Sequence, residues 1–543
     1  MLNQLYYGDN LEILRKYIPD NSIDLIYLDP PFNSKADYNI IFKEINGNKP
    51  ISQIKAFSDF WHWDANTQNT YEELMNNPKY PEKLKRLIGV FDGFLGRNDL
   101  FAYLVMLSIR LVELRRVLKD TGLLYLHCDQ TASHYIKLVL DAIFNPKNFR
   151  NEIIWKKSNS PKVQSRGFGT QHDSLFLYSK GPQSTYNPVK REPDANYLKS
   201  FSMDDNDGRG PYQSVALVAG GMQRSETRKV FEFKGITAAW LYSPENLEKF
   251  WNENRIIKTK SGYRLKVYLK NLGGPSVSDI WDDKEVSPLQ GQSKELLGYP
   301  TQKPLALLER IIKASSNEDD LVLDPFCGCG TTLDAAEKLH RRWIGIDITH
   351  IAIHVIKKRL TERYPDVKFE IIGEPEDLES ARELALQDRF QFQLWALSLV
   401  NATPSERKSG DRGIDGVIYS TFLNKNYYGI VQIKSGTVGV KDIRDFRGTL
   451  EREKADFGIF VTLDEPTEGM KAEAVVKGSF NTEWGEKIPI IQIATINDLL
   501  NGVTPKLPAP PNNYNVATKG KRKGKEPLQA TMDEIIDKTK QFN

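Results

Sequence analysis

Residues 322–348 read VLDPFCGCGTTLDAAEKLHRRWIGIDI and restrict the fold more than any other stretch of the chain. An apolar run ends in Asp324, a loop with Gly328 and Gly330 follows, and a helical segment leads to a second apolar run that ends in Asp347. This layout is typical of a nucleoside-cofactor site, because the helix start offers free N–H groups to an anion and the second acid binds the ribose. Asp347 follows Asp324 by 23 residues, near the ~20 expected for such a ribose acid. An ordinary turn with glycines placed for packing is the alternative.

Short apolar strands alternate with amphipathic helices in two separate regions of the chain. The first region covers residues 1–145, with strands expected at 23–28 and 123–127, and the second begins near residue 304. This alternation predicts α/β architecture with a doubly wound, mostly parallel, Rossmann-like sheet. We therefore expect one sheet that is completed by two distant segments of the chain.

The strand predicted at 23–28 runs into the letters DPPF. Consecutive prolines fix the backbone and remove two N–H donors. If this strand neighbours the one that ends in Asp324, both open on the same cleft. Asp29 and the Pro30 carbonyl could then accept hydrogen bonds from one ring amine and make it a better nucleophile for methyl transfer, while Pro31 and Pro30 hold the acceptors still. Phe32 offers a stacking face for a planar base. Alternatively, the prolines only end a strand and Phe32 is a core residue.

These motifs resemble those of the DNA amino-methyltransferases that use S-adenosylmethionine. DPPF resembles their catalytic motif, DPFCGCGTT at 324–332 their cofactor loop, PTQKP at 300–304 the segment before it, and YYGDN at 6–10 a motif near the cofactor adenine. The catalytic motif precedes the cofactor motif in the sequence, and this motif order is similar to that of the circularly permuted beta class of these methyltransferases. The resemblance covers most of residues 1–372. It implies catalytic roles for Asp29, Pro30, Pro31 and Phe32, and cofactor contacts from Asp9, Thr301, Lys303, Asp324, Phe326, Gly328, Gly330 and Asp347.

The resemblance also implies a substrate and a mechanism. The substrate is double-stranded DNA, and the target base is flipped into the pocket because its amine is inaccessible while paired. An Asp rather than a Ser at position 29 favours adenine N6 over cytosine N4 as the acceptor. No metal is needed for this transfer. We interpret Cys327 and Cys329 as packing residues of the cofactor loop rather than metal ligands.

A second unit is expected from about residue 375, with the letters GDRGIDGVIYSTFLNKNYYGIVQIKSG at 410–436. Two-residue spacing places Gln432 and Lys434 on one face of a strand. An acid facing such a pair can bind Mg²⁺ and place a water against a phosphodiester. The pattern resembles the Mrr-like branch of the restriction endonuclease fold, a smaller α/β domain. It implies catalytic roles for Asp415, Gln432 and Lys434, with Asp415 and Gln432 on the metal side.

This second motif departs from the family pattern in one respect. Members often carry an acid on the first helix, where this chain has Gln391 and Gln393. Fewer carboxylates bind Mg²⁺ more weakly, although Asp411 could compensate. The alternative is that Asp415 and Lys434 are a solvent-facing pair on a hairpin.

The region between the two halves lacks a sustained period and contains Lys156, Lys157, Lys162 and Arg166, which suit phosphate contacts. We interpret it as an inserted target-recognition region. His172 and Asp173 resemble part of a structural strand. The expected domains are a methyltransferase catalytic half at 1–150, the recognition insert at 151–295, the cofactor-binding half at 296–372, the nuclease-like domain at 375–503, and a linker with a basic tail at 504–543.

Bulk properties set the remaining expectations. A net charge of +3 gives no overall signature of nucleic-acid binding, so any basic surface is local. The three cysteines form no CxxC pair, and no long apolar stretch suggests a membrane segment. We expect a cytoplasmic restriction-modification or defence enzyme, with a homodimer left open. The alternatives are a methyltransferase, for adenine or cytosine N4, whose C-terminal domain only binds DNA, and a non-catalytic DNA-binding module.

Overall fold

The protein is described here as a computed structural model. The described residues are 2–31, 37–42, 52–58, 62–160, 168–219, 230–259, 262–293, 295–297, 299, 301–405, 413–422, 425–481 and 487–508; for 37–42, 52–58, 420–422 and 425–426 this covers the backbone alone. Phe32, Asp411, Lys162, Arg166 and most of the predicted tail lie outside these ranges. No helix within the described ranges is long and apolar enough to cross a membrane.

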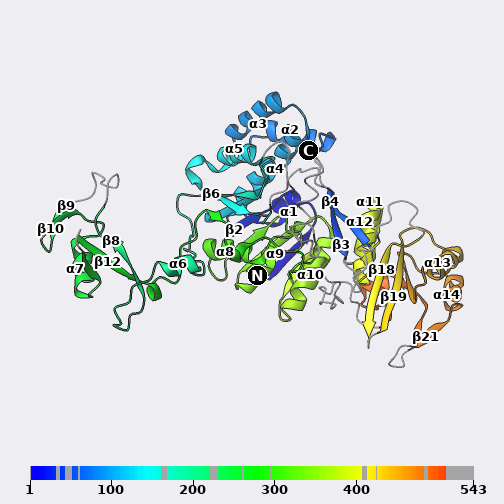
Figure 1. Ribbon diagram of the computed structural model, residues 1–543. Coiled ribbons are helices and arrows are strands. Elements are labelled where there is room, and N and C mark those ends of the chain that lie inside the picture. Colours follow the sequence, from blue (N-terminus) through cyan, green and yellow to red (C-terminus); the bar gives the residue numbers. More distant parts are fainter. Residues whose placement is uncertain are drawn as a thin grey trace, which may run out of the picture.

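A nine-stranded sheet organises the N-terminal two thirds of the chain (Figure 1). Its strand order is β13 (Ile280–Trp281), β6 (Phe149–Lys156), β7 (His172–Ser179), β5 (Leu118–Cys128), β2 (Ile23–Leu28), β14 (Leu321–Asp324), β15 (Arg342–Asp347), β1 (Asn3–Tyr7) and β16 (Phe369–Ile372). Neighbours from β5 to β16 pair in parallel. The expected sheet from two distant segments is confirmed, since β2 lies directly beside β14.

Helices cover both faces of this sheet, which makes the fold doubly wound. One face packs on α1 (Asn10–Tyr17), α2 (Ala65–Asn76), α3 (Glu82–Leu95), α4 (Asp99–Val117) and α5 (Ser133–Phe144), and the other on α8 (Leu305–Ser315), α9 (Thr331–Lys338) and α10 (His350–Arg363). In β2, Ile26 and Leu28 belong to the first core and Leu25 and Tyr27 to the second. Burial on both faces explains why β2 reads as an uninterrupted apolar run.

The sheet extends further into the predicted insert than expected. β7 pairs antiparallel with β5, and β6 pairs antiparallel with β7. The predicted boundary at residue 151 therefore falls inside β6, and the first part of the predicted insert belongs to the large sheet rather than to a separate region. The half-exposed start of β6 weakens its apolar signal, because its burial begins only at Ile153.

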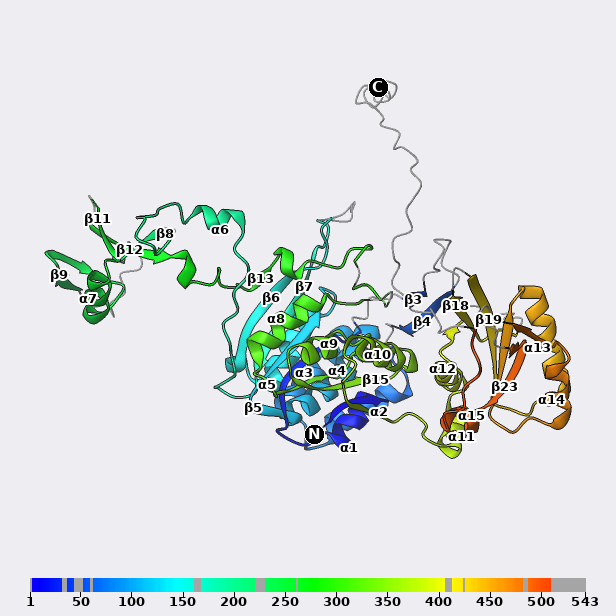
Figure 2. The same cartoon turned by 90° about the horizontal axis from the view of Figure 1, so that it is seen from below.

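Residues 195–268 of the predicted insert form a small separate unit, which stands apart from the sheet in Figures 1 and 2. It has its own aromatic core around Trp240, Phe233 and Tyr263. Its elements are α6 (Ala195–Lys199), β8 (Tyr212–Ala216), β9 (Val230–Phe233), β10 (Ile236–Ala239), α7 (Pro244–Asn252), β11 (Ile256–Thr259) and β12 (Gly262–Tyr268).

The C-terminal domain has a five-stranded sheet between two helical layers. Its strand order is β17 (Thr403–Pro404), β18 (Gly416–Phe422), β19 (Lys425–Lys434), β20 (Phe457–Thr462) and β23 (Ile491–Thr495). One core includes α11 (Leu378–Gln387), α12 (Arg389–Leu399) and α15 (Ile496–Leu500), and the other α13 (Val440–Glu453) and α14 (Glu468–Val475). The C-terminal domain also contains the antiparallel pair β21 (Ser479–Asn481) with β22 (Lys487–Pro489). A second antiparallel pair, β3 (Asp37–Phe42) with β4 (Ser52–Ser58), lies in the N-terminal part of the chain.

Candidate functional site

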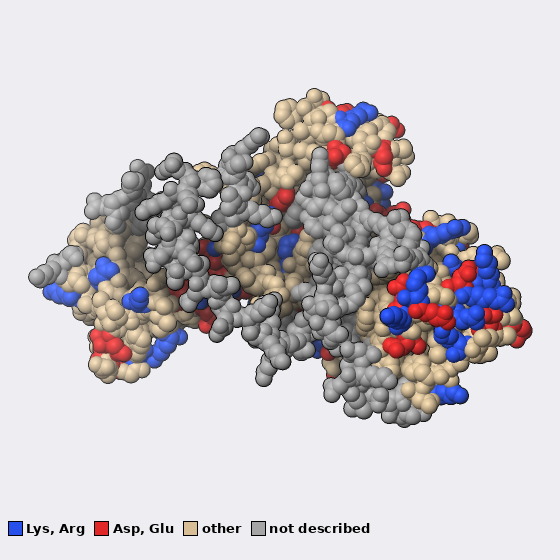
Figure 3. Space-filling model, turned by 45° about the vertical axis from the view of Figure 1, so that its right-hand side comes forward, with Lys and Arg blue, Asp and Glu red and all other residues tan. Residues whose placement is uncertain are grey.

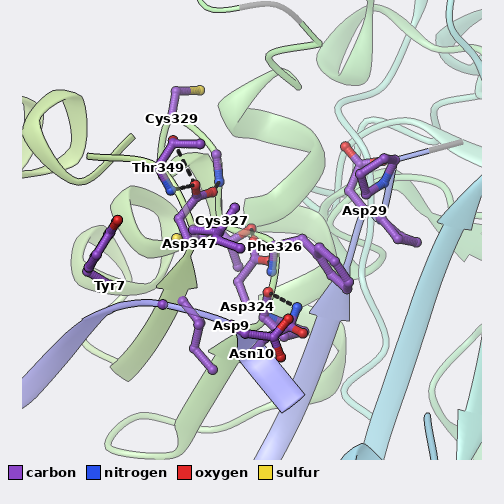
Figure 4. A pocket seen from close by; sticks show the side chains of 18 of the residues that line it. Tyr7, Asp9, Asn10, Asp29, Asp324, Phe326, Cys327, Cys329, Asp347 and Thr349 are labelled. Atoms are coloured by element: carbon purple, nitrogen blue, oxygen red, sulfur yellow. Dashed lines mark hydrogen bonds between the residues drawn. The ribbon is translucent and has the colours of Figure 1, made fainter. Parts of the chain in front are cut away.

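A cavity of about 760 Å³ opens where β1, β2, β14 and β15 end (Figure 4). The parallel strands point their carboxyl ends to this edge, which is where ligands bind in open α/β sheets. The predicted residues that line it are Asp9, Asp29, Pro30, Pro31, Thr301, Lys303, Asp324, Phe326, Gly328 and Asp347. Two motifs almost 300 residues apart in the sequence therefore share one cavity.

Gly328 and Gly330 of the cofactor loop are glycines for different structural reasons. Gly328 and Gly330 both have positive φ angles, +49° and +73°, which glycine adopts at little cost. A Cβ at Gly330 would lie 2.7 Å from Ile356 Cγ1, so this glycine is required by packing against α10. Gly328 instead lines the cavity. Cys327 and Cys329 are buried and belong to apolar clusters, and both also line the cavity; the Cys329 thiol lies 3.6 Å from Thr331 Oγ1.

Two acids, Asp324 that is buried and Asp347 that is partly buried, shape the cofactor loop. Asp324, 3% exposed, accepts hydrogen bonds from Phe326 N at 3.0 Å and Thr332 Oγ1 at 2.5 Å. Asp347 accepts bonds from Gly328 N at 2.9 Å and from Thr349 N at 3.0 Å. Burial raises the pKa of Asp324 to about 7 and that of Asp347 to about 6. Asp347 thus connects two loops and still presents carboxylate oxygens to the cavity.

Asp29 lies across the cavity from Asp347 (Figure 4). One carboxylate oxygen, Oδ2, forms an ion pair with Lys303 Nζ. The other, Oδ1, is buried and accepts no hydrogen bond from any described residue. A buried acceptor without a donor is costly unless a ligand supplies one. Lys303 therefore holds the Asp29 carboxylate in place, and Oδ1 is positioned to accept a hydrogen bond from a ligand in the cavity.

In the C-terminal domain, Asp415 immediately precedes β18. Its carboxylate accepts hydrogen bonds from Ile433 N at 2.6 Å and from Gln393 Nε2 at 2.7 Å. Gln432 is 8% exposed, and its Nε2 lies close to Gly413, two residues before Asp415. The structure thus joins Asp415 to α12, with Gln393 at the position where the family carries an acid.

The donor set for a metal in this domain is sparse. The described ranges contain no cluster of three or more His, Cys, Asp or Glu side chains arranged for a metal. Mg²⁺ commonly uses one or two carboxylates and keeps several waters. Asp415 would supply the protein carboxylate for a weakly held, largely hydrated Mg²⁺.

Comparison with known proteins agrees with this geometry. A DNA methylase family model matches residues 23–358. The chain belongs to the DNA methylase family. A restriction endonuclease model matches residues 386–499, so this methylase also carries a restriction endonuclease domain.

Several curated relatives belong to restriction-modification systems. The type II methyltransferase M.EcaI of Enterobacter cloacae is 35% identical over 363 residues, which cover 66% of this chain and 69% of that protein. The type III StyLTI Mod subunit of Salmonella typhimurium is 25% identical, with 62% of this chain and 50% of that protein covered. Among solved structures, the cytosine-N4-specific PvuII DNA methyltransferase matches 68% of this chain and 94% of its own at 13% identity, with a TM-score of 0.30.

One charged residue of the methylase pocket was not predicted from the sequence. Arg110, buried in α4, donates to Asp9 Oδ2 and Asn10 Oδ1, each at 2.6 Å. Asn10 in turn donates to Pro325 O at 2.8 Å. Asp9 also caps α1 by accepting from Leu11 N at 2.8 Å. Asp9 therefore fixes how α1 approaches the cofactor loop. In the sequence, the signal for this network was a lone arginine inside an apolar helix.

A buried polar chain behind the catalytic motif was also missed. Tyr27, which lines the cavity, bonds through its hydroxyl to His127 Nδ1 at 3.0 Å. His127 Nε2 lies 3.2 Å from Asp173 Oδ2, and Lys157 donates to Asp173 Oδ1 at 2.5 Å. The hydrogen bond to His127 and the ion pair with Lys157 lower the pKa of Asp173, although burial opposes them. Lys157 thus holds a strand acid, whereas the sequence suggested a phosphate contact.

The cavity has one further wall that no motif revealed. Residues of the C-terminal domain line it together with the methylase residues: Leu384, Gln387, Asp388, Phe390 and Gln391. Leu394 of α12 packs with Ile351 and Ala352 at the start of α10, immediately after the β15 loop. Packing between domains has no local sequence signature, so it was outside the reach of motif analysis.

Proposed function

We propose that this protein methylates the N6 amine of adenine in double-stranded DNA, using S-adenosylmethionine, and that its C-terminal domain cleaves DNA with Mg²⁺. The single observation that carries the first part is Asp29, whose unsatisfied Oδ1 lies in the same cavity as the Gly328 loop. An acceptor for an amine and a loop suited to a nucleoside cofactor are the two halves of a methyl-transfer site.

The residues present fit this cofactor. The cavity volume lies within the ~300–1,000 Å³ common for small-molecule sites. Asp347 can accept from ribose hydroxyls while Gly328 N fixes its orientation. S-adenosylmethionine would supply an electrophilic methyl group at its sulfonium.

The chain's own residues prepare the acceptor. Asp29 Oδ1 accepts one hydrogen of the target amine, and the Pro30 carbonyl accepts the other. Both bonds direct the nitrogen lone pair toward the methyl donor instead of into the ring. Lys303 holds the Asp29 carboxylate in one orientation, so that positioning supplies much of the rate enhancement. The target base reaches these atoms by flipping out of the duplex.

Adenine is preferred to cytosine in this proposal because an Asp precedes the two prolines. The test is to incubate the purified protein with unmethylated DNA and S-adenosylmethionine, and to read modified bases by single-molecule sequencing. We expect N6-methyladenine in one sequence context. N4-methylcytosine would refute the choice of base, and absence of any methylated base would refute the activity.

A second candidate function for the C-terminal domain is DNA binding without cleavage. It is favoured by the sparse carboxylate set and by Gln393 beside Asp415. The two functions are separated by incubating unmethylated plasmid with the protein and Mg²⁺, with EDTA as the control. Metal-dependent cleavage supports the nuclease, and retention of intact plasmid on the protein supports the binding function.

We also propose that the small unit built from residues 195–268 reads the DNA sequence. It projects beyond the sheet on the side of β6 and β13, as Figures 1 and 2 show. A separate module can contact base edges over a length of duplex while one base enters the cavity. Exchange of this module for that of a relative with known specificity should transfer the methylated sequence context.

A further inference from the structure

We propose that α12 of the nuclease domain is part of the cofactor site, with Gln391 as a cofactor ligand, and that cofactor binding is thereby coupled to the placement of the nuclease acid Asp415. This inference rests on the proposed use of S-adenosylmethionine. It adds a ligand from a different domain and a link between the two activities.

The first observation is that the end of α11 and the start of α12 line the methylase cavity. Asp388 caps α12 by accepting from Phe390 N at 2.9 Å and Gln391 N at 3.0 Å, so the first turn of α12 is fixed. Asp388, Phe390 and Gln391 line the same cavity as Asp347. The nuclease domain therefore closes the cavity that the methylase loops leave open.

The second observation concerns the amide of Gln391. Its Oε1 is buried and accepts no hydrogen bond from the described part of the chain. S-adenosylmethionine carries donors in its ribose hydroxyls, adenine amine and ammonium group. Leu394, one turn further along α12, packs at the start of α10 that follows Asp347. This places Gln391 on the ribose side, where a hydroxyl or the adenine amine is the matching donor.

The third observation links the same helix to the nuclease site. Gln393, two residues after Gln391, donates to Asp415 Oδ1 at 2.7 Å. The other oxygen of Asp415 accepts from Ile433 N at 2.6 Å. A ligand that restrains the first turn of α12 therefore restrains the side chain that orients Asp415. Coupling between two sites is reciprocal, so an ordered Asp415 must also favour cofactor binding.

The coupling has a definite direction. Cofactor contact with Gln391 selects the arrangement in which Gln393 bonds to Asp415, and this arrangement presents the carboxylate for Mg²⁺. Cofactor should therefore protect the Ile433 amide from hydrogen exchange and increase the cleavage rate. The non-reactive product S-adenosylhomocysteine should do the same, because no methyl transfer is involved.

The binding test uses the full chain and calorimetric titration of S-adenosylhomocysteine. We expect Gln391→Ala to weaken binding about 3- to 10-fold, the effect of one lost hydrogen bond. The matched control is Leu386→Ala, an 86% exposed position on the neighbouring helix outside the cavity, which should bind as the wild type does. Equal thermal unfolding of both variants without ligand shows that Gln391→Ala folds.

The coupling test measures hydrogen exchange in the peptide that contains Ile433, with saturating S-adenosylhomocysteine. We expect ligand-dependent protection in the wild type and its loss in Gln393→Ala, which by reciprocity also binds the ligand more weakly, by no more than the lost coupling factor. Equal affinity of Gln391→Ala and its control, or unchanged exchange at Ile433 in the liganded wild type, would overturn this inference alone. A wild type that binds no ligand would overturn it together with the proposed cofactor.

Discussion

The methylase cavity and the nuclease site differ in how much of the chemistry the chain itself provides. The cavity brings together loops from four strands and contains an acceptor, Asp29, already in place. Of the predicted nuclease-site residues that the structure describes, Asp415 alone carries a carboxylate, which accepts hydrogen bonds from Gln393 and Ile433. Methyl transfer from a charged donor depends on positioning, whereas phosphodiester hydrolysis needs positive charge that a metal brings. A cavity built from several loops is consistent with the need for positioning, and a site with few carboxylates is consistent with a metal that supplies the positive charge.

The surface of the nuclease domain supports the same contrast. Figure 3 shows Lys and Arg interspersed with Asp and Glu on its visible face. On α13 and α14, Arg444 and Arg447 both pair with Glu473, and Lys477 pairs with Glu451. Paired charges attract phosphates less than a continuous basic patch does. The visible face of this domain therefore carries charges that are largely paired with one another.

The largest expected effect tests the methylase side. Asp29→Ala should lower kcat for methylation on the order of 10³-fold, because the target amine loses its charged acceptor. Cofactor affinity should change less than about threefold, since the loss falls on the transition state. The measurement is transfer of labelled methyl groups to DNA, with the exposed Asp366→Ala as the control. Retained activity would show that Asp29 is only a strand end.

The second effect tests the nuclease side. Lys434→Ala should lower Mg²⁺-dependent plasmid cleavage about 100-fold, because no ammonium group orients the attacking water. Methylation by the same preparation should be unchanged, and Lys441→Ala on the surface of α13 should cleave normally. If both lysine variants cleave equally, the candidate Asp415 site is not where hydrolysis occurs.

A third effect, about tenfold, follows from the pKa of Asp347. Burial raises that pKa to about 6, so the carboxylate is mostly protonated below pH 6. Only the ionised form of Asp347 accepts hydrogen bonds from two hydroxyls. Cofactor affinity should therefore rise with pH and level off above the pKa of Asp347. At pH 5 about a tenth of the groups are ionised, and the Kd should be about tenfold weaker than its plateau value.

Asp347→Asn isolates this effect from Asp324, whose pKa is raised to about 7 and which ionises over a neighbouring range. The variant should bind the cofactor more weakly at every pH and lose the step near pH 6. Calorimetric Kd values from pH 5 to pH 8 provide the measurement. A step that persists in Asp347→Asn would assign the titration to another group.

The smallest effect concerns the polar chain behind the catalytic motif. Tyr27→Phe removes the hydroxyl that bonds to His127 and leaves that imidazole without this partner. We expect a 3- to 10-fold lower methylation rate with unchanged cleavage. Tyr186→Phe, at an exposed position, is the control. An equal loss of cleavage would indicate general destabilisation rather than a role in the methylase pocket.

Motifs tied to strand ends were well predicted from the sequence. β2 has the predicted bounds, and the Asp29 and Gly328 loops share a cavity, because parallel strands bring their carboxyl ends to one edge. Arg110 and the chain from Tyr27 to Asp173 were missed because their partners lie far apart in sequence. The wall formed by Gln391 was missed for a related reason: it depends on how two domains pack.

The place of β1 in the sheet has a consequence for synthesis on the ribosome. β1 precedes the other strands of its sheet in the chain, yet it pairs with β15 and β16, near the end of the methylase portion. Residues 375–503 emerge later, which at ~5–20 residues per second takes roughly 6 to 26 seconds more. Each nascent chain therefore holds all strands of the large sheet before the C-terminal domain is translated, and the cavity wall formed by the end of α11 and the start of α12 is added last.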